Sequence, residues 1–271
     1  MNIDQHTTLY GVVGTPIVHS LGPVMHNAAF SATGLNSIYL AFETEDIAGC
    51  LKGMRAFGIR GLSVTIPFKA EVIPHLDELD PLAKKIGAVN TVVNNNGRLV
   101  GYNTDALGAF QALEEKIALP GKSCLIFGAG GAARAIGYML KEKDVAVSIA
   151  NRSRERGEAL ALSLGCPFTP LDKVEEKGAD LLIQTTPVGM YPHIEQHPVP
   201  EHLLSVGKVV MDIIYNPPET RLLKIAKAHG CATISGLSMF VYQGGEQFRL
   251  WTGINPPVSA MSRAVKKALS E

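Results

Sequence analysis

One stretch of the chain constrains the fold more than any other, because an apolar segment runs into glycines and then into small residues. It reads Leu-Ile-Phe-Gly-Ala-Gly-Gly-Ala-Ala over residues 125–133. Gly128 permits a tight turn, Gly130 lets the backbone approach phosphate oxygens, and Ala133 lets a helix pack on the strand. The free N–H groups and the dipole at such a helix start favour an anion. The stretch therefore predicts a strand, a turn and a helix that bind the pyrophosphate of a dinucleotide.

A second segment, roughly 20 residues further along, indicates which dinucleotide binds. The strand-like residues 145–150 are followed by Asn-Arg-Ser-Arg-Glu-Arg over residues 151–156. An Asp or Glu at this strand end would accept the ribose 2′-OH of NAD, whereas cations and hydroxyls suit a 2′-phosphate. The sequence therefore predicts NADP. The alternative is a solvated helix start that Ser153 caps.

Composition favours small-molecule chemistry over binding to a polymer or a membrane. The 271 residues are enough for two domains. The 25 positive charges of Lys and Arg equal the 25 negative charges of Asp and Glu. No net positive field is therefore expected to hold nucleic acid or an anionic membrane. Residues 1–8 lack the pattern of a signal peptide, no apolar run approaches about 18 residues, and the four cysteines form no C-x-x-C pair. We expect a soluble cytoplasmic protein with reduced cysteines.

Strand-like and helix-like segments alternate along the chain, which is typical of the α/β class. Before the glycine run, the expected strands are residues 9–13, 38–42 and 61–66, the expected helices are 23–33, 46–57 and 80–87, and a hairpin is expected around 94–97. After Asp105, strands are expected near residues 124, 147, 182 and 210, and helices near 132, 158 and 222. Periodicity alone does not place two final helices, at about 237–252 and 258–270.

This alternation predicts two α/β domains with a cleft between them. Residues 1–103 and 238–271 are expected to form a substrate-binding domain with a mostly parallel sheet. Residues 104–237 are expected to form a Rossmann-type domain that binds NADP.

Hydride transfer to or from an alcohol needs a group that exchanges the hydroxyl proton. Lys69 lies just past an apolar strand that Pro67 stops, and Asp105 lies at the junction of the two domains. A Lys and an Asp that meet can act as a proton-transfer pair, in which the carboxylate holds the ammonium. The alternatives are a solvated Lys69 at a helix start and an Asp105 that caps the next helix.

These segments together resemble the shikimate dehydrogenase family, and the match runs in order over nearly the whole chain. The matching motifs are residues 14–20 with Pro23 and His26-Asn27, 64–69, 87–91, 101–105, 128–133, 151–153, 212–217 and 236–243. The resemblance implies reversible reduction of 3-dehydroshikimate to shikimate by NADPH, a step towards chorismate and the aromatic amino acids.

The resemblance also assigns roles to residues. It implies that Lys69 and Asp105 form the catalytic pair. The positions that it implies at the substrate are Ser20, Gly22, Thr65, Asn90, Asp105, Tyr215 and Gln243. Those at NADP are Gly128, Ala129, Gly130, Gly131 and Ala132 at the pyrophosphate, Asn151, Arg152, Ser153 and Arg156 at the 2′-phosphate, and Ile213, Gly236 and Met239 at the nicotinamide.

Two positions depart from the family's pattern. The substrate motif usually reads Ser-x-Ser, but this chain has Gly22 at the second serine. Its missing hydroxyl removes a donor to the substrate carboxylate and opens space beside the ring carbon that bears it. Quinate carries an extra hydroxyl at that carbon, and family members that act on quinate can have glycine here. The second departure is Ser63, where bacterial members often have Asn.

Three interpretations therefore stay open. The first is a shikimate dehydrogenase, the second a quinate/shikimate dehydrogenase or a paralogue with relaxed specificity, and the third a catalytically silent NADP-binding regulator. Lys69 and Asp105 argue against the regulator, which needs no proton-transfer pair. We expect no metal, because His193, His197 and His202 lie among prolines with no helix to align them. We also expect no nucleic-acid or membrane partner, and a monomer or a homodimer.

Overall fold

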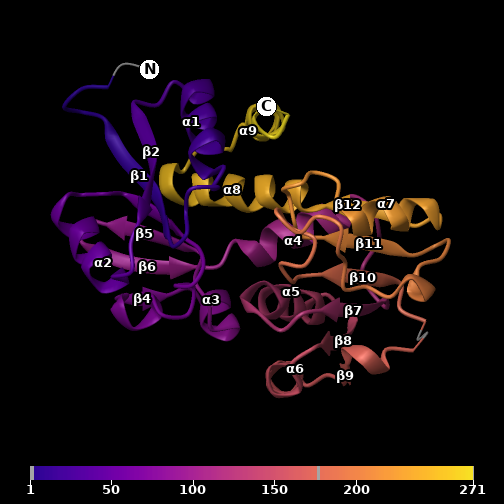
Figure 1. The fold of residues 1–271 in the computed structure, drawn as a ribbon. Helices are drawn as coiled ribbons and strands as arrows, with labels where there is room; N and C mark the ends of the chain where they lie inside the picture. Colours follow the sequence, from indigo (N-terminus) through magenta and orange to yellow (C-terminus); the bar gives the residue numbers. More distant parts are fainter. Residues whose placement is uncertain (1–2, 176–177, 271) are drawn as a thin grey trace. The chain divides into compact units, whose positions relative to one another are not determined.

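The protein, described by a computed structural model, divides into two compact units. The first unit comprises Met1–Thr104 and Val241–Glu271, and the second unit comprises Asp105–Phe240. The structure describes residues 3–175 and 178–270. Each unit contains a six-stranded sheet flanked by helices, which confirms the α/β class (Figure 1).

The first unit has a mixed sheet with the strand order β2-β1-β3-β5-β6-β4. Its strands are β1 (Thr8–Gly14), β2 (Ser37–Glu43), β3 (Gly61–Val64), β4 (Glu78–Leu79), β5 (Thr91–Asn95) and β6 (Arg98–Tyr102). β1 pairs in parallel with β2 and β3, whereas β5 runs antiparallel to both β3 and β6. β5 and β6 are antiparallel because a hairpin, rather than a crossover helix, connects them.

Local signals in the sequence set the helix ends of the first unit. Its helices are α1 (Gly22–Thr33), α2 (Ile47–Ala56), α3 (Pro81–Ile86), α9 (Val258–Ala268) and most of α8 (Gly236–Thr252), with a 3₁₀ turn η1 (Ile73–His75). The Asp46 carboxylate caps α2 by accepting from Gly49 N at 2.8 Å, and Asp80 caps α3 by accepting from Leu82 N at 2.9 Å. Gly87, with φ 68°, ends α3 in the left-handed conformation.

The hairpin turn predicted around residues 94–97 is confirmed, and it consists of two residues. Asn95 pairs with Arg98, so only Asn96 and Gly97 connect β5 to β6. Both have positive φ, 54° and 95°, as a type I′ turn requires. Asn and Gly adopt this conformation at low cost, which explains the sequence signal.

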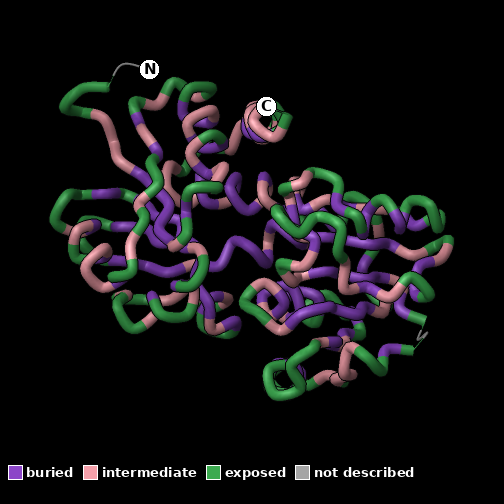
Figure 2. The backbone as a smooth tube through the Cα atoms, in the orientation of Figure 1, coloured by how far each residue is buried: buried purple, intermediate pink, exposed green. Residues whose placement is uncertain are grey.

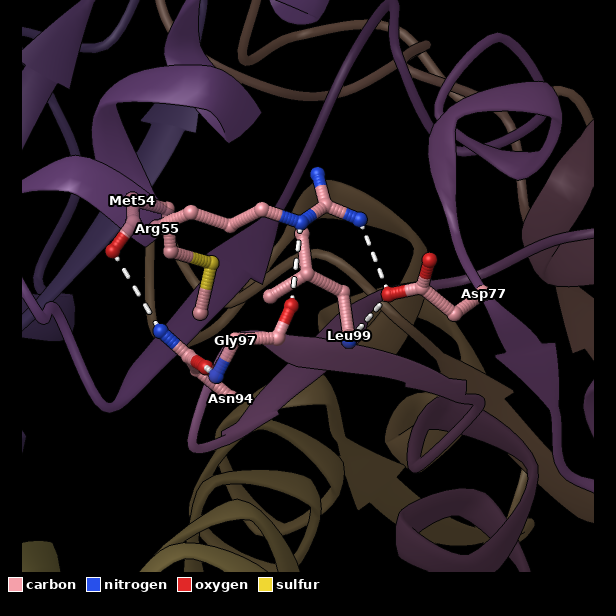
Figure 3. Close-up of polar contacts among 6 residues, drawn as sticks. All are labelled: Met54, Arg55, Asp77, Asn94, Gly97 and Leu99. Atoms are coloured by element: carbon pink, nitrogen blue, oxygen red, sulfur yellow. Dashed lines mark hydrogen bonds and ion pairs between the residues drawn. The ribbon is translucent and has the colours of Figure 1, made fainter.

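Side chains from outside the hairpin hold it in place (Figure 3). Arg55 donates from Nε to the Gly97 carbonyl at 3.0 Å and from Nη2 to the Asp77 carboxylate at 2.8 Å. The same carboxylate oxygen accepts from Leu99 N at 2.6 Å. The Leu99 N–H and the Arg55 guanidinium lower the pKa of Asp77. Asn94 Nδ2 donates to the carbonyls of Met54 and Ile59. These bonds fix the register of β5, which starts directly after Asn90.

The second unit has a fully parallel sheet with the order β12-β11-β10-β7-β8-β9. Its strands are β7 (Ser123–Phe127), β8 (Ala146–Asn151), β9 (Phe168–Pro170), β10 (Leu181–Gln184), β11 (Val209–Asp212) and β12 (Ala232–Ser235). Its helices are α4 (Asp105–Glu114), α5 (Gly131–Glu142), α6 (Arg154–Leu164), α7 (Arg221–Ala228) and the start of α8, with 3₁₀ turns η2 (Leu171–Lys173) and η3 (Glu201–Leu203). β10 and β11 are buried along their whole length (Figure 2). This is the Rossmann-type sheet that the glycine run predicts, with its strands ending at one edge.

Within the described residues, no helix is both long and apolar enough to cross a membrane.

Candidate functional site

In the first unit, the sheet brings three of the predicted residues together. Thr65 follows β3 and donates from its backbone N to Val13 O at 3.0 Å. The carbonyl of Asn90 accepts from Val64 N at 2.8 Å, and that of Lys69 accepts from Val89 N at 2.7 Å. Thr65, Lys69 and Asn90 are therefore neighbours beyond the carboxyl end of β3.

Gln243 and Thr104 join this group through the Asn90 side chain. Asn90 Oδ1 accepts from Thr104 N at 2.7 Å and from Thr91 Oγ1 at 2.8 Å. Its Nδ2 therefore faces Thr104 Oγ1 at 3.0 Å and Gln243 Oε1 at 3.4 Å. Because the backbone N–H of Thr104 can only donate, the Asn90 amide has a single orientation.

Ser20 and Gly22 lie together at the start of α1, and they adjoin a buried tyrosine. Gly22 N donates to Ser20 Oγ at 3.2 Å. A Cβ atom at Gly22 would lie 3.2 Å from Ser20 Oγ, 3.2 Å from Tyr39 Cε1 and 3.4 Å from Tyr39 Oη. The Tyr39 hydroxyl donates to Ser63 Oγ at 2.6 Å, and burial raises the pKa of this phenol. The space that a side chain would take at position 22 is thus bordered by Tyr39.

In the second unit, the glycine turn has the geometry that a pyrophosphate needs. Gly128 has φ 120°, and a Cβ there would lie 2.4 Å from Thr185 Oγ1. A Cβ at Gly130 or Gly131 would meet no atom within 4 Å in the described chain. α5 starts at Gly131, and no side chain of the described residues caps its first N–H groups. Ala129 and Ala132 are partly exposed beside them. The turn fits an anion at the helix N-terminus.

The segment after β8 is both a capped helix start and a cluster of cations. Ser153 Oγ accepts from Arg156 N at 3.4 Å, so the capping alternative raised from the sequence is observed. Asn151 Nδ2 donates to Ser153 O at 2.8 Å and braces the same turn.

Two guanidiniums of this segment have no acidic partner among the described residues. Arg152 and Arg156 are exposed, and neither forms an ion pair within residues 3–175 and 178–270. Arg154, by contrast, has its Nη1 3.6 Å from Glu158 Oε1. Unpaired cations oppose the dipole at a helix N-terminus, and a bound phosphate would compensate them. Arg152 and Arg156 therefore fit a 2′-phosphate.

The loop after β11 carries Ile213, one of the residues predicted at the nicotinamide, and Asp212 anchors this loop. Asp212 Oδ1 accepts from Ile214 N at 3.1 Å, and Oδ2 accepts from Thr220 Oγ1 at 2.7 Å. Burial raises the pKa of this carboxyl to about 6. Both ends of the loop between residues 213 and 220 are thus bound to one buried side chain.

Close packing also holds this loop against the start of α8. A Cβ at Gly236 would lie 2.1 Å from Ile213 O, so only glycine allows this approach. The ring of Tyr215 stacks on Phe240 at 4.5 Å between centroids, and burial raises the pKa of the Tyr215 phenol. Met239 is buried on the same helix. The structure therefore places Ile213 and Gly236 next to each other.

We expect Asp212→Asn to reduce the pH dependence of stability. The raised pKa means that the folded protein holds a proton that the unfolded chain releases near its ordinary value of 3.8. The protonated Asp212 carboxyl contributes to the free energy of unfolding. This contribution is fully present below pH 3.8 and is lost as the pH rises through about 6. Between about pH 4.5 and 7.5, the parent should lose roughly 2 kcal/mol relative to the variant. Thermal unfolding of both proteins at the two pH values measures this, and parallel pH profiles would contradict it.

The proline-rich segment holds its histidines by backbone contacts. His197 Nδ1 is 2.9 Å from Val199 O, and His202 Nε2 is 3.3 Å from Val174 O. Among the described residues, no group of three or more His, Cys, Asp or Glu side chains could hold a metal ion.

The sequence reasoning missed a set of buried polar side chains behind the first unit's site: His26, Tyr39, Thr104 and Gln247. His26 and Thr104 lie inside the quoted motifs, but their type gave no reason to choose function over packing. Tyr39 and Gln247 lie at inward positions of a strand and a helix, where the hydrophobic pattern expects core residues.

A parallel sheet with an anion-binding glycine turn, together with a sheet edge that carries Lys, Thr and Asn side chains, defines a two-domain α/β oxidoreductase of the Rossmann type. Three family models match the chain. The shikimate dehydrogenase substrate binding domain matches residues 12–92, shikimate / quinate 5-dehydrogenase matches residues 111–213, and the shikimate 5′-dehydrogenase C-terminal domain matches residues 236–266. The chain belongs to the shikimate dehydrogenase family.

Relatives and solved structures agree with this assignment. Shikimate dehydrogenase (NADP(+)) of Thermococcus kodakarensis is 49% identical over 99% of both chains. The shikimate 5-dehydrogenase of Thermus thermophilus, solved with NADP(H) and shikimate, is 40% identical with a TM-score of 0.90, and the match covers 96% of this chain and 99% of that one. Quinate dehydrogenase from Corynebacterium glutamicum, solved with NAD, is 33% identical with a TM-score of 0.90, and the match covers 96% and 99%.

Proposed function

We propose that this protein is an oxidoreductase that catalyses the reversible, NADPH-dependent reduction of 3-dehydroshikimate to shikimate. The observation that carries the proposal is the grouping of Lys69, Thr65 and Asn90 at one edge of the first unit's sheet. An ammonium, a hydroxyl and an amide there can bind a polyhydroxylated ring and exchange a proton with it. Membership of the family supports this substrate over other cyclic hydroxy acids.

Each unit would bind one ligand. The first unit would bind the substrate, with Ser20 and Thr65 as hydroxyl donors and Asn90 and Gln243 as amide partners. The second unit would bind NADP at Gly128–Ala132, with Arg152, Arg156, Asn151 and Ser153 around the 2′-phosphate. Ile213, Gly236 and Met239 would contact the nicotinamide, and Tyr215 the substrate. The proposed domain bounds are residues 1–103 with 238–271, and 104–237.

Lys69 and Asp105 would move the proton. NADPH, when bound, supplies the hydride that forms the new C–H bond at the carbonyl carbon. As the C=O π bond breaks, the Lys69 ammonium donates a proton to the oxygen, and water restores that proton to Lys69 afterwards. The Asp105 carboxylate would orient the ammonium. In the oxidation of shikimate, neutral Lys69 accepts the hydroxyl proton.

A second candidate activity is the oxidation of quinate. Gly22 carries no hydroxyl for the substrate carboxylate, and a family relative solved with NAD is a quinate dehydrogenase. We propose that the missing side chain admits the extra ring hydroxyl of quinate.

Four initial rates test both proposals: shikimate and quinate, each with NADP and with NAD. Turnover of shikimate with NADP supports the main proposal. Turnover of quinate supports the second. Binding of NADP without turnover of either substrate would instead indicate a silent regulator.

We expect Gly22→Ala and Gly22→Ser to lower kcat/KM for quinate about tenfold relative to shikimate, because either side chain presses on Tyr39 and fills the added space. The alanine variant isolates the effect of size from that of the serine hydroxyl. Gly53→Ala is a matched control, since Gly53 lies in α2 of the same unit and a Cβ there meets only the Phe57 side chain, at 3.8 Å. An unchanged substrate ratio in both Gly22 variants would refute the role of Gly22.

A further inference from the structure

A continuous chain of buried polar side chains runs behind the substrate edge of the first unit. It links residues from α1, β2, β3, β5 and α8, and its members are His26, Tyr39, Ser63, Asn90, Thr91 and Gln247. All six are less than a tenth exposed. Such a network specifies one arrangement only when the direction of each hydrogen bond is fixed.

The Gln247 amide fixes these directions. Its Nε2 lies 3.1 Å from Asn90 O and 3.0 Å from Thr91 Oγ1. A backbone carbonyl can only accept, so the amide nitrogen must face Asn90. The Gln247 oxygen therefore points the other way, to His26 Nε2 at 3.2 Å and Ser63 Oγ at 2.9 Å.

The directions continue from Gln247 to the predicted substrate residues. Thr91 Oγ1 accepts from Gln247, and its own hydrogen goes to Asn90 Oδ1 at 2.8 Å. This leaves Asn90 Nδ2 facing Thr104 and Gln243. The Asn90 amide is thus held in one orientation from two sides, by Thr104 N directly and by Gln247 through Thr91.

The surroundings of the His26 ring provide one hydrogen-bond partner, an acceptor, among the described residues. Its ring is fully buried, stacked on Tyr39 with centroids 4.5 Å apart and 5.1 Å from the ring of Trp251. Since Gln247 Oε1 can only accept, His26 must carry its hydrogen on Nε2. Within the described chain, Nδ1 is buried without a hydrogen-bond partner. Burial lowers the pKa of His26 to about 3, so the ring stays neutral.

We propose that His26 is a positioning residue: its Nε2–H, together with the Asn90 carbonyl and the Ser63 hydroxyl, holds the Gln247 amide in the orientation on which the Asn90 and Gln243 amides of the proposed substrate site depend. The inference rests on the proposed function of this edge as the substrate site. His26 Nδ1 is buried without a hydrogen-bond partner in the described chain, which is unfavourable. An apolar residue at position 26 would pack here without burying such an atom.

Two substitutions separate the hydrogen bond from the packing. His26→Phe keeps a stacked ring but removes the donor, whereas His26→Gln keeps an amide N–H near the position of Nε2 but removes the ring. We expect His26→Phe to raise the KM for shikimate about fivefold to tenfold, with kcat and the KM for NADP changed by less than about twofold. His26→Gln should retain the KM for shikimate, although it lowers the Tm.

A second readout does not depend on turnover. In ¹⁵N spectra of the full ligand-free chain, the side-chain amide signals of Asn90 and Gln243 should shift in His26→Phe and stay close to the parent in His26→Gln. Unchanged signals in His26→Phe, or equal KM changes in both variants, would overturn the proposal. The spectra need no substrate, so they test the role of His26 even if the parent protein does not oxidise shikimate. That lack of turnover would refute the proposed function and leave the proposal about His26 to the spectra.

Discussion

Lys69→Ala is expected to lower kcat for shikimate oxidation by about 10²-fold or more while leaving the affinity for NADP within about twofold of the parent. Lys69 follows β3 and its carbonyl is bound by Val89 N, so the side chain starts from a fixed point in the first unit. The residues proposed to bind the cofactor all lie in the second unit. Loss of the proton carrier should therefore affect turnover alone. Steady-state kinetics and a fluorescence titration with NADPH measure the two quantities.

Two further variants define the role of Lys69 more closely. Lys69→Arg retains the positive charge but holds its proton too tightly to exchange it, so we expect no recovery of kcat. Lys84→Ala, at an exposed position of α3, removes a cation from the same unit and should leave kcat unchanged. Turnover of Lys69→Ala comparable to that of the parent would remove Lys69 from the mechanism.

Arg152→Ala is expected to raise the KM for NADP by about tenfold to a hundredfold while changing the KM for NAD by less than about threefold. The exposed guanidinium has no acidic partner in the described chain, so a charge-assisted bond to the 2′-phosphate is available to it. NAD lacks that phosphate and cannot lose the bond. Initial rates with both cofactors at saturating shikimate give the comparison.

The neighbouring Arg154 supplies the matched control for this prediction. It lies two residues away, is also exposed, and already pairs with Glu158 at 3.6 Å. Arg154→Ala should therefore change the KM for NADP by less than about threefold. Equal effects of Arg152→Ala on NADP and NAD would mean that this segment does not distinguish the two cofactors.

The parts of the fold that could be predicted from the sequence are those with local causes. Asp46 and Asp80 cap the helices that they precede, and Asn96-Gly97 makes the type I′ turn. The glycine run forms the strand, turn and helix expected of it. In each case, a few consecutive residues determine the backbone conformation.

The elements that could not be predicted depend on residues distant in sequence. β4, β9 and β12 are short edge strands with little buried surface, so they leave no periodic signal. The hydrogen bond between His26 and Gln247 joins positions 221 residues apart. No local pattern distinguishes a buried histidine that orients an amide from one that only packs.

Among the proposed site residues of the second unit, some could likewise be predicted from local sequence and others could not. The glycine turn has a sequence signature that indicates its role, whereas Asp212 lies inside a matching motif that does not reveal its bond to Thr220. Its partner across the sheet, Gln184, binds the following loop in the same way through Thr186 and Val188. Two adjacent strands therefore end in buried polar side chains that hold the loops after them, a device visible only in three dimensions.

The contact between position 22 and Tyr39 also couples substitutions at these two positions. A Cβ introduced at Gly22 would lie 3.2 Å from Tyr39 Cε1, so a ring that is stacked on His26 and bound to Ser63 would have to move by a few tenths of an ångström. A smaller residue at position 39 would relieve this contact. Substitutions at positions 22 and 39 are therefore expected to be non-additive, so the effect of one depends on which residue occupies the other.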